Sequence, residues 1–114
     1  MKRKENATMT EAMELTSFAL VPGCSTAKFV AANADINVWL QRQPGFCSRR
    51  VTELDDGSIV DMLIWGTAAQ GRDAAARIMT EMGHSPVHAL IDQGSVDWRI
   101  ARVRQSTVLL KAAA

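Results

Sequence analysis

The stretch from Phe46 to Gly66 carries the clearest pattern of hydrophobic and polar positions in the chain. Two runs rich in β-branched and aromatic residues flank the polar segment Asp55-Asp56-Gly57. Such runs suit strands on a pleated, partly buried surface, and a glycine after aspartate supplies the positive φ of a tight turn. The pattern predicts a β-hairpin. Strict alternation would place Phe46 and Arg49 on opposite faces of its first strand.

The second strand of this hairpin, 59–65, is apolar on both faces except at Asp61. A strand with one face in water would alternate more cleanly, so both faces of this one are expected to be covered. A buried carboxylate must be paired or hydrogen-bonded. Either Arg49 or Arg50, on the neighbouring strand, can supply that cross-strand partner.

Helical spacing appears on both sides of the hairpin. Apolar residues recur every three or four positions from Ser25, a good N-cap, to Gln43, before Pro44 ends the helix. A second stripe follows Thr67, which with Gln70 matches a capping box, and it ends near Gly83. Asn33 lies beside the first stripe, where it either flanks the helix or points into a ligand cavity.

Two outer strands complete the pattern. The first spans 11–21 and stops at Pro22-Gly23, and the last spans 95–104 after a short helical segment that starts at Pro86. The order strand, helix, strand, strand, helix, strand predicts an α+β, ferredoxin-like βαββαβ fold. We expect a four-stranded antiparallel sheet in the order 4-1-3-2, with both helices on one face.

The chain of 114 residues is long enough for one domain. We expect that domain over 11–104, after a disordered tail at 1–10 and before a tail at 105–114 that has no clear pattern. Two helices cover only one face of the predicted sheet. Since an exposed apolar face is a liability, we expect the uncovered faces of two copies to pack together as a homodimer.

Composition and charge argue against nucleic acid as a partner and against a membrane or secreted protein. A net charge of +1 gives no electrostatic reason to expect nucleic acid. No apolar run approaches the ~18 residues of a membrane span, and the basic start lacks the apolar region of a secretory signal. We therefore expect a cytoplasmic protein. Cys24 and Cys47 match no metal-binding spacing and are expected to be free thiols.

The two histidines are the side chains whose ordinary pKa lies near neutral pH. His84 and His88 are four residues apart, but Ser85-Pro86 interrupts a helix between them and no carboxylate completes a zinc motif. We therefore predict no metal site. His84 is either a solvent-facing turn residue or a general base at the edge of a cavity.

Three short pieces carry a resemblance to a known family. They are the Gln43-Pro44-Gly45-Phe46 turn followed by Arg49, the Asp56-Gly57 turn, and Trp65 leading through Thr67 into an alanine-rich helix. From about Glu14 to Arg104 the chain resembles antibiotic-biosynthesis-monooxygenase-like members of the dimeric α/β-barrel superfamily. The resemblance implies dimers paired through their sheets, with a small-molecule cavity between sheet and helices in each protomer.

The resemblance also bears on chemistry. Some relatives oxidise aromatic polyketides without a cofactor, and others degrade haem with an Asn, a Trp and a His. Trp65 matches the position of that Trp, but the first strand has no Asn and His84 lies beyond the helix that carries the His. Haem degradation is therefore disfavoured, and we expect no cofactor. By itself, a Trp in a strand is as well explained by core packing.

Two functional hypotheses follow. The first is an enzyme that acts on a small apolar or aromatic molecule, for example by an oxygen-dependent oxidation without metal or flavin. Its catalytic candidates are His84, Asp61 and Asn33, and its cavity would be lined by Phe29, Ile36, Trp39, Trp65 and Arg49. The second is a non-catalytic homodimeric binding or stress-related module with no open cavity. A hole of ~300 Å³ or more with convergent polar groups would favour the first.

Overall fold

The computed structural model describes residues 10–110. The N-terminal tail predicted at 1–10 lies outside this range except for its last residue. The last four residues of the C-terminal tail also lie outside it. The described elements are β1 (Ala12–Phe18), α2 (Thr26–Ala31), α3 (Ala34–Gln41), β2 (Phe46–Glu53), β3 (Ile59–Trp65), α4 (Ala68–Glu81), the 3-10 helices η1 (Pro86–Leu90) and η2 (Gln93–Ser95), and β4 (Asp97–Arg102).

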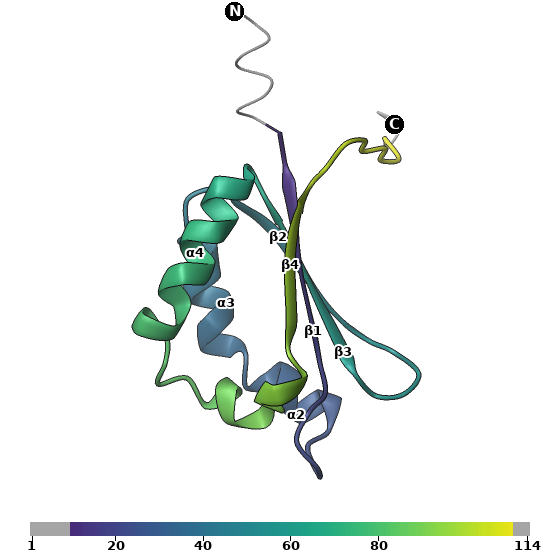
Figure 1. Ribbon diagram of the computed structural model, residues 1–114, viewed down its shortest axis with the longest axis vertical. Helices are drawn as coiled ribbons and strands as arrows, with labels where there is room; N and C mark the ends of the chain where they lie inside the picture. Colours follow the sequence, from purple (N-terminus) through teal and green to yellow (C-terminus); the bar gives the residue numbers. More distant parts are fainter. Residues whose placement is uncertain (1–9, 111–114) are drawn as a thin grey trace, which may run out of the picture.

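The strands form one antiparallel sheet in the order β2-β3-β1-β4. This order and the ferredoxin-like arrangement are the ones that the sequence predicted. Figure 1 shows α3 and α4 together on one side of the sheet. Gly57, with a φ of 87°, makes the predicted hairpin turn between β2 and β3. No helix within residues 10–110 is long and apolar enough to cross a bilayer.

The helix predicted for 25–43 is two helices, and the break falls at Asn33. Ser25 caps α2 as expected, because its side chain accepts a hydrogen bond from the Lys28 backbone N–H. At the break the Asn33 side chain donates to the Phe29 carbonyl at 2.8 Å. An asparagine that bonds to nearby backbone competes with helical hydrogen bonds. The single long helix was therefore wrong, although its apolar stripe was real.

A register shift near the start of β2 corrects the predicted strand faces. The pairing of β2 with β3 is irregular between Phe46 and Ser48. An extra residue in one strand moves every earlier side chain to the other face. Phe46 therefore shares a face with Arg49, and its ring packs edge-on against Trp65 with 5.6 Å between centroids.

The two faces of the sheet have different surroundings. Along β3, Ile59, Asp61, Leu63 and Trp65 are buried, and the residues between them are half-buried. The buried face meets the helices, where Phe29, Ile36 and Leu40 complete the hydrophobic core. Asp61 and Trp65 thus point toward the helices, into the space in which a ligand would lie.

Helix α4 packs unusually close to the sheet at Gly71. A Cβ added there would stand 2.6 Å from Ile100 Cδ1 and 2.9 Å from Trp65 Cδ1. Thr67 caps the helix by accepting from the Gln70 backbone N–H at 3.1 Å. The Gln70 side chain lies against Gly45, in the space that a Cβ of Gly45 would occupy. Gln70 therefore fills the turn before β2, a contact that the capping-box pattern did not predict.

Candidate functional site

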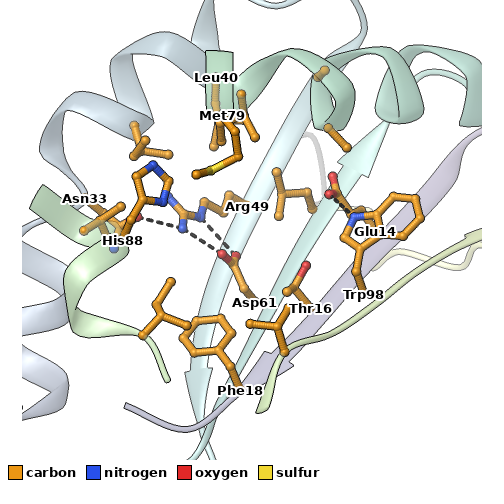
Figure 2. A pocket seen from close by; sticks show the side chains of 18 of the residues that line it. Glu14, Thr16, Phe18, Asn33, Leu40, Arg49, Asp61, Met79, His88 and Trp98 are labelled. Atoms are coloured by element: carbon orange, nitrogen blue, oxygen red, sulfur yellow. Dashed lines mark hydrogen bonds and ion pairs between the residues drawn. The ribbon is translucent and has the colours of Figure 1, made fainter. Parts of the chain in front are cut away.

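A cavity of ≈ 320 Å³ lies between the helix-covered face of the sheet and the helices. Its walls are mostly apolar. The lining side chains come from all four strands and from α2, α3, α4 and η1. Polar groups enter it at a few points, and Figure 2 shows those of Glu14, Thr16, Asn33, Arg49, Asp61 and His88. The volume exceeds the ~300 Å³ that separates a small-molecule pocket from a packed core. The space between sheet and helices is therefore not filled solid.

Arg49 is the centre of the polar groups on one side of the cavity. Its Nε donates to Asp61 Oδ1 at 3.0 Å, and its Nη2 donates to Asp61 Oδ2 at 2.7 Å. The side chains of Arg49 and Asp61 are only 11% and 12% exposed. A two-pronged pair of this kind holds both groups in fixed positions. Of the two arginines considered from the sequence, Arg49 is the partner of Asp61.

Helix α3 holds the same guanidinium from the opposite side. Nη2 of Arg49 donates to Asn33 Oδ1 at 2.8 Å, and Nη1 donates to Asn37 Oδ1 at 2.7 Å. Residues four apart lie on one face of a helix, so the two amides present their oxygens side by side. Asn33 is 3% exposed and lines the cavity. Of the two positions considered for Asn33, the structure shows the one in which its side chain lines the cavity.

The middle of the cavity floor is a row of residues that face one another across the sheet. Thr16 pairs with Asp61 on one side and with Trp98 on the other. Its hydroxyl has no hydrogen-bond partner among residues 10–110, and it lines the cavity. Thr16 therefore offers both a donor and an acceptor to a bound molecule, between an ion pair and an indole.

A second polar cluster lies where β1 meets β4. The Glu14 carboxylate accepts from Trp65 Nε1 at 2.8 Å and from Trp98 Nε1 at 2.6 Å. Burial raises the pKa of Glu14 above the ordinary value of a glutamate, and the two indole N–H groups offset only part of that effect. Glu14 is therefore easier to protonate than a glutamate on the surface.

Glu14, Trp98 and His88 are cavity residues that the sequence hypothesis did not include. Glu14 was the only carboxylate on the first predicted strand after its start, on the face that also carries Phe18. That isolated charge in a strand was a usable signal. Nothing local in the sequence indicated that Trp98 would reach a glutamate 84 residues away.

The two histidines lie in different surroundings. His84 is exposed and does not line the cavity, so it is not a cavity-edge base. His88 is half-buried and lines the cavity, and its Nε2 lies 2.9 Å from the Met82 carbonyl. Because a carbonyl only accepts, Nε2 carries the proton when the ring is neutral, and Nδ1 is then the acceptor.

The apolar residues chosen from the sequence lie in or at the cavity. Phe29, Ile36, Trp39 and Trp65 all line it. Trp65 is 1% exposed and also belongs to the core. Trp39 is fixed from α4, since its Nε1 donates to Glu81 at 2.9 Å and Arg77 lies 5.6 Å above its ring. Within residues 10–110 no three His, Cys, Asp or Glu side chains gather as metal ligands.

Several solved structures share this fold. SnoaB, a cofactor-independent oxygenase from Streptomyces nogalater, matches with a TM-score of 0.66 at 21% identity, over 85% of this chain and 96% of SnoaB. The monooxygenase ActVA-Orf6 from Streptomyces coelicolor, solved with the ligand nanaomycin D, gives 0.62 at 17%, over 92% and 97%. No family model matches the chain, and no curated protein matches its sequence.

A third structure, from Bordetella bronchiseptica and proposed to be an antibiotic biosynthesis monooxygenase, has a TM-score of 0.65 at 17% identity. The match covers 88% of this chain and 99% of that one. Such identities establish a common fold, while activity has to be argued from the residues of this chain. The resemblance seen in the sequence is thus confirmed in three dimensions: the chain has the ferredoxin-like fold of the antibiotic-biosynthesis-monooxygenase-like proteins.

Proposed function

We propose that the protein binds a small hydroxylated aromatic molecule in the cavity and oxidises it with dioxygen, as a monooxygenase-like enzyme. The observation that supports this most strongly is the cavity of ≈ 320 Å³, in which apolar walls enclose Arg49, Thr16 and His88. Pockets for small molecules combine a mostly apolar lining with a few fixed polar groups. The shared fold with two oxygenases adds an analogy.

The polar groups suit an aromatic hydroxyl. A neutral His88 presents Nδ1 as a proton acceptor from a side chain that lines the cavity. The hydroxyl would lose its proton to that nitrogen, and the anion would form in an apolar surrounding. There, a hydrogen bond from the Thr16 hydroxyl stabilises the negative charge more strongly than the same bond would in water.

The redox balance requires only the substrate and dioxygen. An ionised, electron-rich ring can give electrons directly to dioxygen. One oxygen atom then enters the ring as a carbonyl, and the second leaves as water with two hydrogens from the substrate. The protein contributes binding, deprotonation and exclusion of bulk water, which are positioning and electrostatic effects.

Oxygen uptake with a panel of hydroxylated naphthalenes and anthracenes tests this proposal. His88→Gln keeps a donor for the Met82 carbonyl but removes the base. We expect affinity within about threefold of wild type and a rate lower by about 10²- to 10⁴-fold, the usual contribution of a general base. His84→Gln, outside the cavity, is the matched control. Panel members that bind without oxygen uptake would instead indicate a binding protein without oxygenase activity.

We also propose that two copies pair through the face of the sheet that the helices leave uncovered. That face carries the half-buried apolar residues Met13, Leu15, Val60, Met62 and Ile64. Met13 pairs with Ile64 and Leu15 with Met62 across β1 and β3, and Val60 follows on the same face. This apolar strip favours a second copy. Light scattering at micromolar concentration should give twice the 12.4 kDa of one chain. A mass of one chain would reject the dimer.

A further inference from the structure

A second hollow, of ≈ 470 Å³, lies at the opposite end of the helix-covered face from η1. It is lined by Ala68, Arg72, Ile100, Ala101, Arg102 and Arg104. Figure 1 shows the start of α4 and the end of β4 at the same end of the molecule. The hollow shares no lining residue with the cavity described above, and the contact of α4 with Ile100 at Gly71 lies between them.

The arginines of this hollow come from the end of β4, from the segment just after it and from α4. Ile100 lies on the helix side of the sheet, against Gly71. Arg102 pairs with the buried Ala12, so it is on that side too, and Arg104 follows two residues later. Arg72, in the second turn of α4, completes the set. The small side chain of Ala68 leaves the space between the guanidinium groups open.

The three arginines are not neutralised by carboxylates. Asp73 follows Arg72 directly, but its carboxylate pairs with Arg77 one turn on, at 2.9 Å. Asp97 is held by Arg99, at 3.1 Å. Within residues 10–110, the guanidinium groups of Arg72, Arg102 and Arg104 have no ion-pair or hydrogen-bond partner, and no acidic residue lines the hollow.

We propose that this hollow, the arginine site, binds a phosphate-type oxyanion. Three like charges around one space repel one another, and an anion between them removes that repulsion. Guanidinium forks match the spacing of phosphate oxygens and bind them in pairs. Three cations suit a multiply charged group better than a single carboxylate. The ligand is therefore free phosphate or pyrophosphate, or the phosphate of a larger organic molecule.

Calorimetric titration at low salt tests the site with pyrophosphate, inorganic phosphate and adenosine monophosphate as probes. We expect saturable binding of one anion per chain. Preference for the nucleotide over inorganic phosphate would identify a phosphorylated organic ligand, and the reverse a free oxyanion. The double variant Arg72→Gln/Arg102→Gln should bind at least about tenfold more weakly, which is a loss of about 1.4 kcal/mol.

The matched control is Lys28→Gln/Arg42→Gln, which removes the same charge from exposed positions elsewhere. It should bind within about threefold of wild type. Equal losses in both double variants, or no saturable binding by wild type, would overturn the proposal. Because the altered side chains are exposed, melting temperatures should stay close to wild type. Affinity for an aromatic molecule in the cavity should not change, so this proposal and the proposed function fail independently.

Discussion

Arg49 holds both carboxylate oxygens of Asp61 from the neighbouring strand, at 3.0 Å and 2.7 Å, at the wall of the cavity. The pair does not lie on directly opposed positions, since Arg49 is opposite Leu63 and Asp61 is opposite Val51. A long side chain reaches such a diagonal neighbour easily. The diagonal leaves the guanidinium close enough to α3 for the two asparagines to bind its other edge.

Arg49→Met is expected to destabilise the protein strongly. It keeps most of the side-chain volume but leaves the buried Asp61 charge without its partner, which costs about 3–5 kcal/mol in comparable pairs. Urea unfolding at neutral pH measures the change. Arg42→Met, at an exposed position at the end of α3, should stay within about 0.5 kcal/mol of wild type. A loss below about 1 kcal/mol for Arg49→Met would mean that the pair has little structural role.

Replacing both Arg49 and Asp61 distinguishes the cost of an unpaired buried charge from the cost of lost packing contacts. Arg49→Met/Asp61→Leu removes the unpaired carboxylate, so its free energy of unfolding should recover toward wild type. A double variant as unstable as Arg49→Met would point to the asparagine contacts, and not to Asp61, as the source of the loss.

The raised pKa of Glu14 predicts how stability changes with pH. In the window above the ordinary glutamate pKa, the folded protein holds a proton at Glu14 that the unfolded chain has released. Stability contributed by this group is therefore complete at lower pH and falls as pH rises through the folded pKa. Glu14→Gln has no such proton to lose.

The free energy of unfolding, wild type minus Glu14→Gln, should accordingly decrease from about pH 4 upward. Urea unfolding at half-unit steps of pH gives this difference. Glu53→Gln, an exposed residue, is the matched control and should give a nearly flat difference. A difference that grows with pH would mean that the indole hydrogen bonds outweigh burial, contrary to the assignment of Glu14.

Much of the fold could be predicted because its signals are local. The glycine at the hairpin turn, the caps at Ser25 and Thr67, and the apolar stripes each need only a few neighbouring residues. The break at Asn33 and the irregularity near Phe46 could not. At Asn33 the side chain bonds to the Phe29 carbonyl one turn back, a local competition with the helix that the apolar period does not reveal. Near Phe46 the pairing with the next strand is irregular and the ring packs on Trp65, which overrides the simple alternation.

The residues of the candidate site also include some that the sequence could predict and some that it could not. Asp61 and Arg49 were recognisable because a charge in an apolar strand demands a partner on the adjacent strand. His88 was not, since its place depends on how the loop after α4 folds back and brings Nε2 to the Met82 carbonyl. From the sequence, His84 was the candidate base, and only the path of the chain shows that His88 lines the cavity instead.

Gly71→Ala should destabilise the protein although alanine favours helices. Greater helix propensity would add about 1 kcal/mol, but the new Cβ would stand 2.6 Å from Ile100 and 2.9 Å from Trp65. Overpacking of a tight interface costs about 1–3 kcal/mol, so we expect a net loss. Thermal unfolding checks it, with Ala76→Gly on the exposed side of α4 as the reference for propensity. A stabilised Gly71→Ala would show that sheet and helix separate easily.

The central claim is that the cavity between sheet and helices is a binding site for a small aromatic molecule. The most direct measurement is calorimetric titration of wild type and Ala75→Phe with hydroxylated naphthalenes, because Ala75 lines the cavity from α4 and a phenyl ring there would fill it. We predict binding of one ligand per chain to wild type and at least tenfold weaker binding to a folded Ala75→Phe, a loss of about 1.4 kcal/mol. No binding to wild type, or equal affinity for the two proteins, would contradict the claim.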